Sequence, residues 1–246
     1  MKLGVGIHVA TRRGLVVVIL ENGRRLLAVK HFRELSEAIT WLEVNALPAT
    51  IGIAAQQGPQ LTLLSHAQGR DQLDPSPPPA RYEHYRVCDY YLARRGIGRR
   101  RSPSASEPLP ESMALGAALF ASLRDRGLRT PRDSNDREAM LLEVVPLAAF
   151  ATLLGAIPPS RSSLAGRAAR EKVLSQLGVE DLPRSLDSQA IDALVAAASA
   201  LAFAEGRGHA IGEPEEGLIV LPVFAAALLT RYGRSPTPGS TPQESG

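Results

Sequence analysis

The chain has 246 residues, enough to bury a full hydrophobic core in one large domain or two small ones. Hydrophobic residues make up 44% of it but aromatic residues only 4%, so Ala, Leu and Val must carry most of the packing. The net charge of +3 permits a nucleic-acid or phosphate partner without requiring one. A single cysteine excludes an intrachain disulfide framework and a cysteine-based zinc cluster.

The start of the chain shows strand-like alternation in place of a charged and then apolar signal segment. No apolar run approaches the ~20 residues that a membrane helix needs, and the longest one, LIVLPVFAAALLT, is interrupted by Pro222. We therefore expect a cytoplasmic protein without a membrane association.

The first fifty residues predict three antiparallel strands, a helix and a fourth strand. Apolar runs separated by polar turns indicate the strands, and Asn22-Gly23 is a strong hairpin signal. Ser36 is the predicted N-cap of the amphipathic segment EAITWLEVNAL. The run TIGIA then predicts a strand that returns parallel to the first. The four strands are expected at residues 3–10, 15–20, 25–32 and 50–54.

This order of elements is the opening of the ribonuclease H-like (RNase H-like) fold. We therefore predict an α/β protein with a mixed central sheet, in which an antiparallel three-strand meander is joined by parallel strands and flanked by helices. In the first strand, apolar residues alternate with glycines, so one face is nearly bare and carries His8 near the strand's end.

The rest of the chain predicts mainly helices. They are expected at about residues 81–95, 111–127, 146–155, 163–177 and 187–206. The small residues of the last one, ALVAAASALAFA, allow it to approach a sheet closely. AMLLEVVP predicts a buried strand stopped by Pro146, and HAIGEPEEGLIVLP a hairpin or edge strand with an acidic turn. We expect one domain over residues 1–232, with a long loop at 55–80, and a disordered tail over 233–246.

Several segments, in this order and spacing, resemble a known protein family. They include IGIAAQQGPQ at the parallel strand, RVCDYYLARRGIG, LLEVVPLAAFATLLG, LAGRAAR, IDALVAAASA and GEPEEGLIVLP. The chain resembles the domain-of-unknown-function family 429, predicted to be an RNase H-like nuclease family, from about residue 3 to residue 222. The resemblance implies cleavage of phosphodiesters by Mg²⁺ or Mn²⁺ ions that carboxylates hold.

Two positions depart from that family's pattern. The family usually has aspartate where His8 stands at the end of the first strand, and again where Ala54 stands at the end of the parallel strand. Alanine cannot ligate a metal, and a neutral imidazole suits Zn²⁺ or Ni²⁺ better than Mg²⁺. His8 is therefore expected in the shell of a former metal site.

Three acids remain as candidates for this site. Glu143 lies within an apolar strand and must be paired, metal-bound or protonated. Asp192 borders the packed stripe of the long helix, where the fold would point it toward the strand ends; it is otherwise a surface acid. Asp89 is either a site residue or a solvated helix acid paired with Arg86 or Arg94. The candidate catalytic residues are His8, Asp89, Glu143 and Asp192, with His8, Glu143 and Asp192 as candidate ligands of weakly bound Mg²⁺ or Mn²⁺.

The segment ARRGIGRRR and the nearby Arg86 form a candidate nucleic-acid contact. Flexible cations of this kind bind a phosphate backbone. A solvated basic loop is the alternative interpretation, because aromatic stacking partners are scarce. The candidate contact residues are Arg86, Arg95, Arg99, Arg100 and Arg101.

Three functional hypotheses follow. The replacement of two central acids favours a degenerate, non-catalytic member that binds nucleic acid, a nucleotide or a protein partner. The alternative is an active divalent-metal-dependent nuclease or phosphodiesterase with a rearranged site. A small-molecule-binding domain on the same scaffold is the third hypothesis, because a fold does not determine a function.

Overall fold

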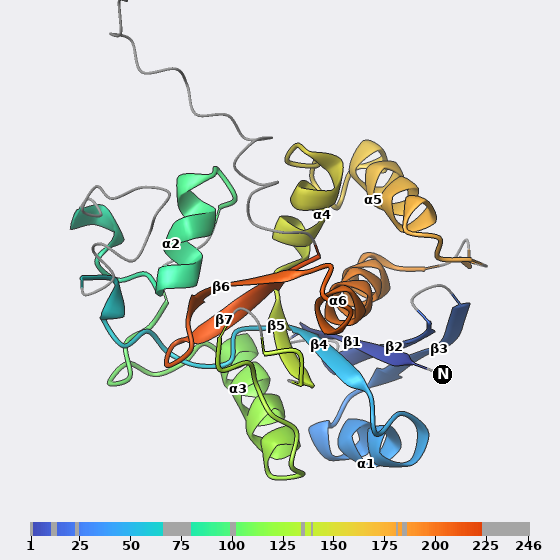
Figure 1. Ribbon diagram of the computed structural model, residues 1–246, viewed down its shortest axis with the longest axis horizontal. Coiled ribbons are helices and arrows are strands. Elements are labelled where there is room, and N and C mark those ends of the chain that lie inside the picture. The colour runs from blue at the N-terminus through green and yellow to red at the C-terminus, as the bar shows by residue number, and fades with distance from the viewer. Residues whose placement is uncertain are drawn as a thin grey trace, which may run out of the picture.

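The apolar runs of the sequence pair into a seven-stranded mixed sheet with helices on both faces (Figure 1). The computed structural model describes residues 2–10, 14–22, 25–65, 80–98, 102–133, 136–138, 140–180, 182–183 and 186–222. The predicted tail over 233–246 lies outside these residues, as do Arg99, Arg100 and Arg101.

The strands lie in the order β3-β2-β1-β4-β5-β7-β6. The first three form the predicted antiparallel meander, β4 pairs in parallel with β1, and β5 and β7 continue the parallel part. Strand β6 closes the edge as an antiparallel partner of β7. This confirms the RNase H-like arrangement. The bounds are Leu3–Ala10 (β1), Gly14–Glu21 (β2), Arg25–Phe32 (β3), Thr50–Ala54 (β4), Leu141–Val144 (β5), His209–Glu213 (β6) and Gly217–Leu221 (β7).

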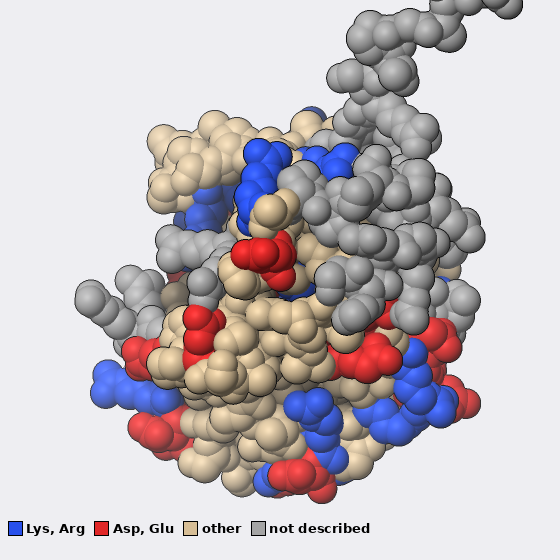
Figure 2. All heavy atoms as spheres, turned by 90° about the vertical axis from the view of Figure 1, so that its left-hand side faces the viewer, with Lys and Arg blue, Asp and Glu red and all other residues tan. Residues whose placement is uncertain are grey.

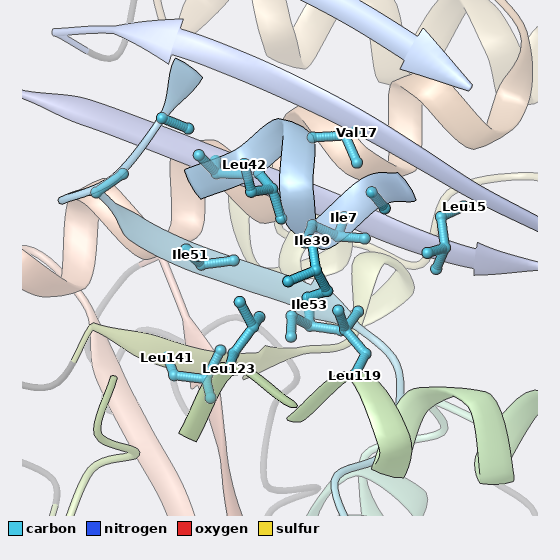
Figure 3. Close-up of a cluster of buried hydrophobic side chains, with 14 of the residues drawn as sticks. Ile7, Leu15, Val17, Ile39, Leu42, Ile51, Ile53, Leu119, Leu123 and Leu141 are labelled. Atoms are coloured by element: carbon cyan, nitrogen blue, oxygen red, sulfur yellow. The ribbon is translucent and has the colours of Figure 1, made fainter. Parts of the chain in front are cut away.

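One face of the sheet packs against α1 (Leu35–Asn45) and α3 (Glu111–Arg124). Alternate residues of the strands, such as Ile7, Val17 and Ile53, point to this side and meet aliphatic side chains of the two helices (Figure 3). Because aromatic residues are few, branched aliphatic side chains fill this core, as the composition predicts.

The opposite face packs against α6 (Ser188–Ala204), which α4 (Pro146–Leu154) and α5 (Leu164–Gln176) cover from outside (Figure 1). The bare glycine face of β1 explains how closely α6 approaches. A Cβ atom at Gly6 would lie 1.7 Å from the carbonyl oxygen of Ala193. The prediction that small residues bring this helix close to the sheet is therefore confirmed.

Helix α2 (Val87–Arg94) stands beside the β6–β7 hairpin at one end of the sheet (Figure 1). It is preceded by the short 3₁₀ turns η1 (Leu63–Ser65) and η2 (Ala80–Tyr82). None of the helices in the described part of the chain is long and apolar enough to cross a membrane.

Two helix starts differ from the predictions. The N-cap of α1 is Glu34 and not Ser36, so the helix begins at Leu35, two residues before the predicted start, and Leu35 packs against the core. The helix predicted from residue 81 begins only at Val87. The preceding residue, Arg86, is extended, with φ −66° and ψ 154°, and its side chain turns into the protein interior.

Candidate functional site

Glu143 lies on β5 and is almost completely buried, with 1% of its surface exposed. Both of its carboxylate oxygens are occupied. Oε1 accepts a hydrogen bond from Nη2 of Arg86 at 2.6 Å, and Oε2 accepts from Nη1 of Arg86 at 2.9 Å and from the backbone N–H of Gln57 at 3.0 Å. The paired state anticipated for an acid in an apolar strand is thus provided by an arginine 57 residues away in the chain.

The same guanidinium holds Asp89. Arg86 Nε donates to Oδ2 of Asp89 at 2.8 Å, and the hydroxyl of Ser102 donates to the same oxygen at 2.9 Å. Arg86 and Asp89 both have 0% exposure. Of the two interpretations of Asp89, the structure shows pairing with Arg86, but in the interior and not in solvent. We call Arg86, Asp89, Glu143 and Ser102 the Arg86 cluster.

Glu216 supports this cluster from the turn between β6 and β7. Its Oε1 accepts from the backbone N–H groups of Leu61 and Leu63, and its Oε2 accepts from that of Val87 at 2.9 Å. It therefore caps α2, whose N-cap residue supplies no side-chain acceptor. Glu216 is not among the residues to which the sequence pointed. Two features of the sequence could have identified it. Glu216 directly precedes a buried strand, and α2 has no Ser, Thr, Asp or Asn at its N-cap, so that helix needs an acceptor from elsewhere.

A second group of charges lies at the other side of the sheet. Asp192, near the start of α6 and 5% exposed, accepts from Nη1 of Arg161 at 2.9 Å. Its Oδ2 lies 3.7 Å from Nδ1 of His8, and that nitrogen is buried without a hydrogen-bond partner. Arg170 on α5 completes the group, which we call the His8 cluster.

Burial changes the titration of this cluster. It is the main cause that lowers the pKa of His8, with Arg161 acting in the same direction and Asp192 against it. Burial also raises the pKa of Asp192, while His8, Arg161 and Arg170 oppose that shift. Each member is thus only partly compensated by its neighbours.

The two clusters occupy opposite faces of the sheet. His8 pairs in register with Ala54, on the side of the glycines that contact α6. Glu143 pairs with Ile53, whose side chain belongs to the other face. The structure therefore brings His8 together with Asp192, and Glu143 together with Asp89, but it does not bring the four candidates to one point.

The side chains at these positions do not fit a divalent cation. Glu143 and Asp89 already face a guanidinium, Ala54 has no donor, and Asp192 shares its oxygen with Arg161. Among the described residues, no group of three or more His, Cys, Asp or Glu side chains is arranged to hold a metal ion. Carboxylates that converge without such partners are what Mg²⁺ or Mn²⁺ requires.

The candidate nucleic-acid contacts are dispersed. Arg86 is buried in its own cluster, and Arg95 is half-buried and donates to the carbonyl of Tyr91 at 2.7 Å. Arg99, Arg100 and Arg101 lie outside the described residues. On the face of the molecule that carries α2, basic and acidic side chains are interspersed over the described surface (Figure 2).

Comparison with known proteins gives one match. Residues 5–216 match the family described as a protein of unknown function (DUF429). No curated protein and no solved structure matches the chain. The match spans the chain from within β1 to the turn before β7, and it agrees with the family that the sequence segments resemble. The chain therefore belongs to the DUF429 family.

Proposed function

We propose that this protein is a non-catalytic member of its family, which binds a phosphate-bearing ligand, a nucleotide or nucleic acid, without a catalytic metal. The observation that carries the proposal is the Arg86 guanidinium, which lies fully buried between the carboxylates of Glu143 and Asp89. A positive charge that the chain itself supplies occupies the place where carboxylates would otherwise converge on a cation.

Three physical points support this proposal. Arg86 stays charged at any ordinary pH, so the pair does not open by deprotonation. A cation beside it would meet a like charge in a medium that screens charge poorly. The carboxylate oxygens would also have to give up short hydrogen bonds to Arg86, which include the 2.6 Å contact of Glu143.

The second candidate function is a metal-dependent phosphodiesterase with a rearranged site. The unpartnered Nδ1 of His8, facing Asp192, is the observation that favours it. One imidazole and one carboxylate suit a transition metal better than Mg²⁺. Arg161 competes for the same carboxylate, which is why we place this function second.

Thermal unfolding with and without millimolar Mn²⁺ or Mg²⁺ tests the two candidates. A bound metal at 100 times its dissociation constant would add about 2.7 kcal/mol to the free energy of unfolding. The proposal expects no shift in the transition temperature and no cleavage of labelled DNA or RNA. A shift, or cleavage, that disappears in Glu143→Ala or Asp192→Ala but persists in the exposed-acid control Glu215→Ala would overturn it.

A gain-of-function variant sharpens the test. His8→Asp combined with Ala54→Asp restores the two aspartates that the family usually has at these positions. If the absence of aspartate at positions 8 and 54 is all that prevents catalysis, the double variant should show Mn²⁺-dependent cleavage. Because Arg86 still neutralises Glu143 and Asp89, we expect none, and cleavage by the double variant would show that Arg86 does not close the site.

A further inference from the structure

A positively charged pocket of about 220 Å³ lies where the loop before α5 meets the first turns of α5 and α6. Three arginines and three serines line it: Arg161, Arg167, Arg170, Ser162, Ser163 and Ser188. Its volume is below the roughly 300–1,000 Å³ of pockets that enclose a drug-sized ligand. The pocket therefore suits a small group, such as one end of a larger molecule.

The local structure holds this pocket open in a defined shape. Gly166 lets the preceding loop pack on α5, because a Cβ atom there would lie 1.9 Å from the carbonyl oxygen of Ser160. Nη1 of Arg170 donates to the carbonyls of Pro159 at 2.9 Å and Gly166 at 2.8 Å, and so fastens the loop to the helix. Ser163 caps α5 by accepting from the N–H of Gly166. The arginines are thus presented by fixed backbone.

The buried and incompletely hydrogen-bonded side chain of Arg170 indicates that the pocket binds a ligand. Its side chain lines the pocket, only 5% of the residue is exposed, and its Nε is buried without a hydrogen-bond partner. A guanidinium has five N–H donors, and the two bonds from Nη1 go to neutral carbonyls. The guanidinium also lies over the ring of Phe150, but Nε still has no acceptor, and a buried donor without an acceptor is costly.

The described residues that line the pocket include three arginines and no acid, although acids nearby pair with two of the arginines. Asp192 pairs with Arg161, and Glu171 pairs with Arg167 at 2.7 Å. The carboxylate of Asp187 is engaged as the N-cap of α6. The remaining negative charge near Arg170 is the shared one of Asp192, and the pKa of Arg170 is lowered, by burial first and then by the neighbouring Arg161. Negative charge is therefore absent from the described lining of the pocket itself.

We propose that this pocket binds the phosphate group of a phosphomonoester, such as the terminal phosphate of a nucleotide or of a nucleic-acid strand. Guanidinium groups match phosphate oxygens in geometry and charge, and the N-terminus of α5 adds a favourable dipole. Leu164, which lines the pocket and is 88% exposed, offers an apolar surface to the organic part of the ligand. This inference specifies the ligand of the binding function proposed above and rests on it for its biological meaning.

Isothermal titration with inorganic phosphate, in EDTA and at constant ionic strength, tests the pocket directly. We expect saturable binding to the full chain that weakens at least tenfold in Arg161→Gln, whose side chain is half-exposed. Arg170→Gln should weaken it further. Arg124→Gln, an exposed arginine on α3, is the matched control and should bind like the parent protein.

Two outcomes would overturn the proposal that the pocket binds phosphate. The first is that phosphate shows no saturable binding. The second is that binding weakens equally in Arg124→Gln and Arg161→Gln, which would indicate unspecific charge attraction. Tighter binding of a 5′-phosphorylated oligonucleotide than of its 5′-hydroxyl counterpart would identify nucleic-acid ends as the source of the phosphate. If only free phosphate or a mononucleotide binds, the ligand is small.

Failure of the pocket proposal can be distinguished from failure of the proposed function. Phosphate binding together with Mn²⁺-dependent cleavage would support the pocket as a phosphate site and refute the non-catalytic role. Absence of both phosphate binding and cleavage would refute the pocket and leave the closure of the metal site by Arg86 intact.

Discussion

The two charged clusters at the ends of the strands differ in how completely their charges are paired. In the Arg86 cluster, the guanidinium and both carboxylates are at most 1% exposed and face one another at 2.6–2.9 Å. In the His8 cluster, the side chain of Arg161 reaches solvent. Nδ1 of His8 and Nε of Arg170 have no hydrogen-bond partner.

This difference in pairing indicates which cluster stabilises the fold and which could gain free energy from a ligand. A fully paired buried network is stable only as a unit, because removing any member leaves a charge without solvent or partner. An incompletely paired group beside a pocket can instead gain free energy when a ligand completes it. The Arg86 cluster therefore stabilises the fold, and the pocket proposed above for phosphate lies beside the less completely paired His8 cluster.

The largest expected effect comes from Arg86→Met. It would leave Glu143 and Asp89 buried and unpaired, and it should lower the free energy of unfolding by about 3–5 kcal/mol. Urea denaturation measures this loss. The combined variant Arg86→Met with Glu143→Met should recover part of it, because one of the two stranded charges is then gone. A loss under about 1 kcal/mol would refute the structural role of the cluster.

Glu216→Ala should have the next largest effect. Three backbone N–H groups, those of Leu61, Leu63 and Val87, lose their acceptor, and we expect a loss of about 2–3 kcal/mol. The neighbouring Glu215 is exposed, so Glu215→Ala should change the free energy of unfolding by less than about 0.5 kcal/mol. Equal effects of the two variants in the same denaturation series would contradict the capping role.

Gly6→Ala tests the other face of the sheet. The new Cβ would overlap the carbonyl oxygen of Ala193 and push α6, with Asp192, away from His8. Overpacking of this kind costs about 1–3 kcal/mol. Gly58→Ala is the control, because a Cβ there meets open space. Calorimetry should show a lower transition temperature for Gly6→Ala alone, and an unchanged one would mean that α6 adjusts freely.

The smallest effect concerns pH. Burial lowers the pKa values of His8 and His209, helped at His209 by Arg137. A histidine with a lowered pKa binds fewer protons in the folded than in the unfolded state. Its contribution to stability is therefore complete above the ordinary value of 6.5 and is lost as the pH falls toward the folded pKa.

Urea denaturation between about pH 7.5 and about pH 5.5 measures this slope. His8→Gln and His209→Gln should each flatten it, and His31→Gln, at an exposed position on β3, is the control for the substitution itself. The raised pKa of Asp192 works in the opposite direction, because the folded state then holds the proton more tightly. A slope that is unchanged in both buried-histidine variants would show that neither group titrates abnormally.

Local patterns of the sequence determined most of the fold. Alternating apolar residues placed the meander and β4, Pro146 ended the strand that holds Glu143, and small residues indicated the close approach of α6. The sequence also established that Glu143 needs a partner, because a carboxylate in an apolar strand has no other stable state than paired, metal-bound or protonated. These conclusions hold because periodicity and burial cost are properties of a few neighbouring residues.

The partners of the charged residues were decided by the tertiary structure. Arg86 meets Glu143 across 57 residues of chain, and Glu216 caps a helix that begins 129 residues earlier. Whether Glu143 and His8 share a site depends on the register of β4 and β5, since a shift of one residue moves a side chain to the other face. The pocket beside Arg170 likewise forms only where two helix starts and a loop come together. Long-range pairing of this kind follows from the packing of whole elements, which no local pattern encodes.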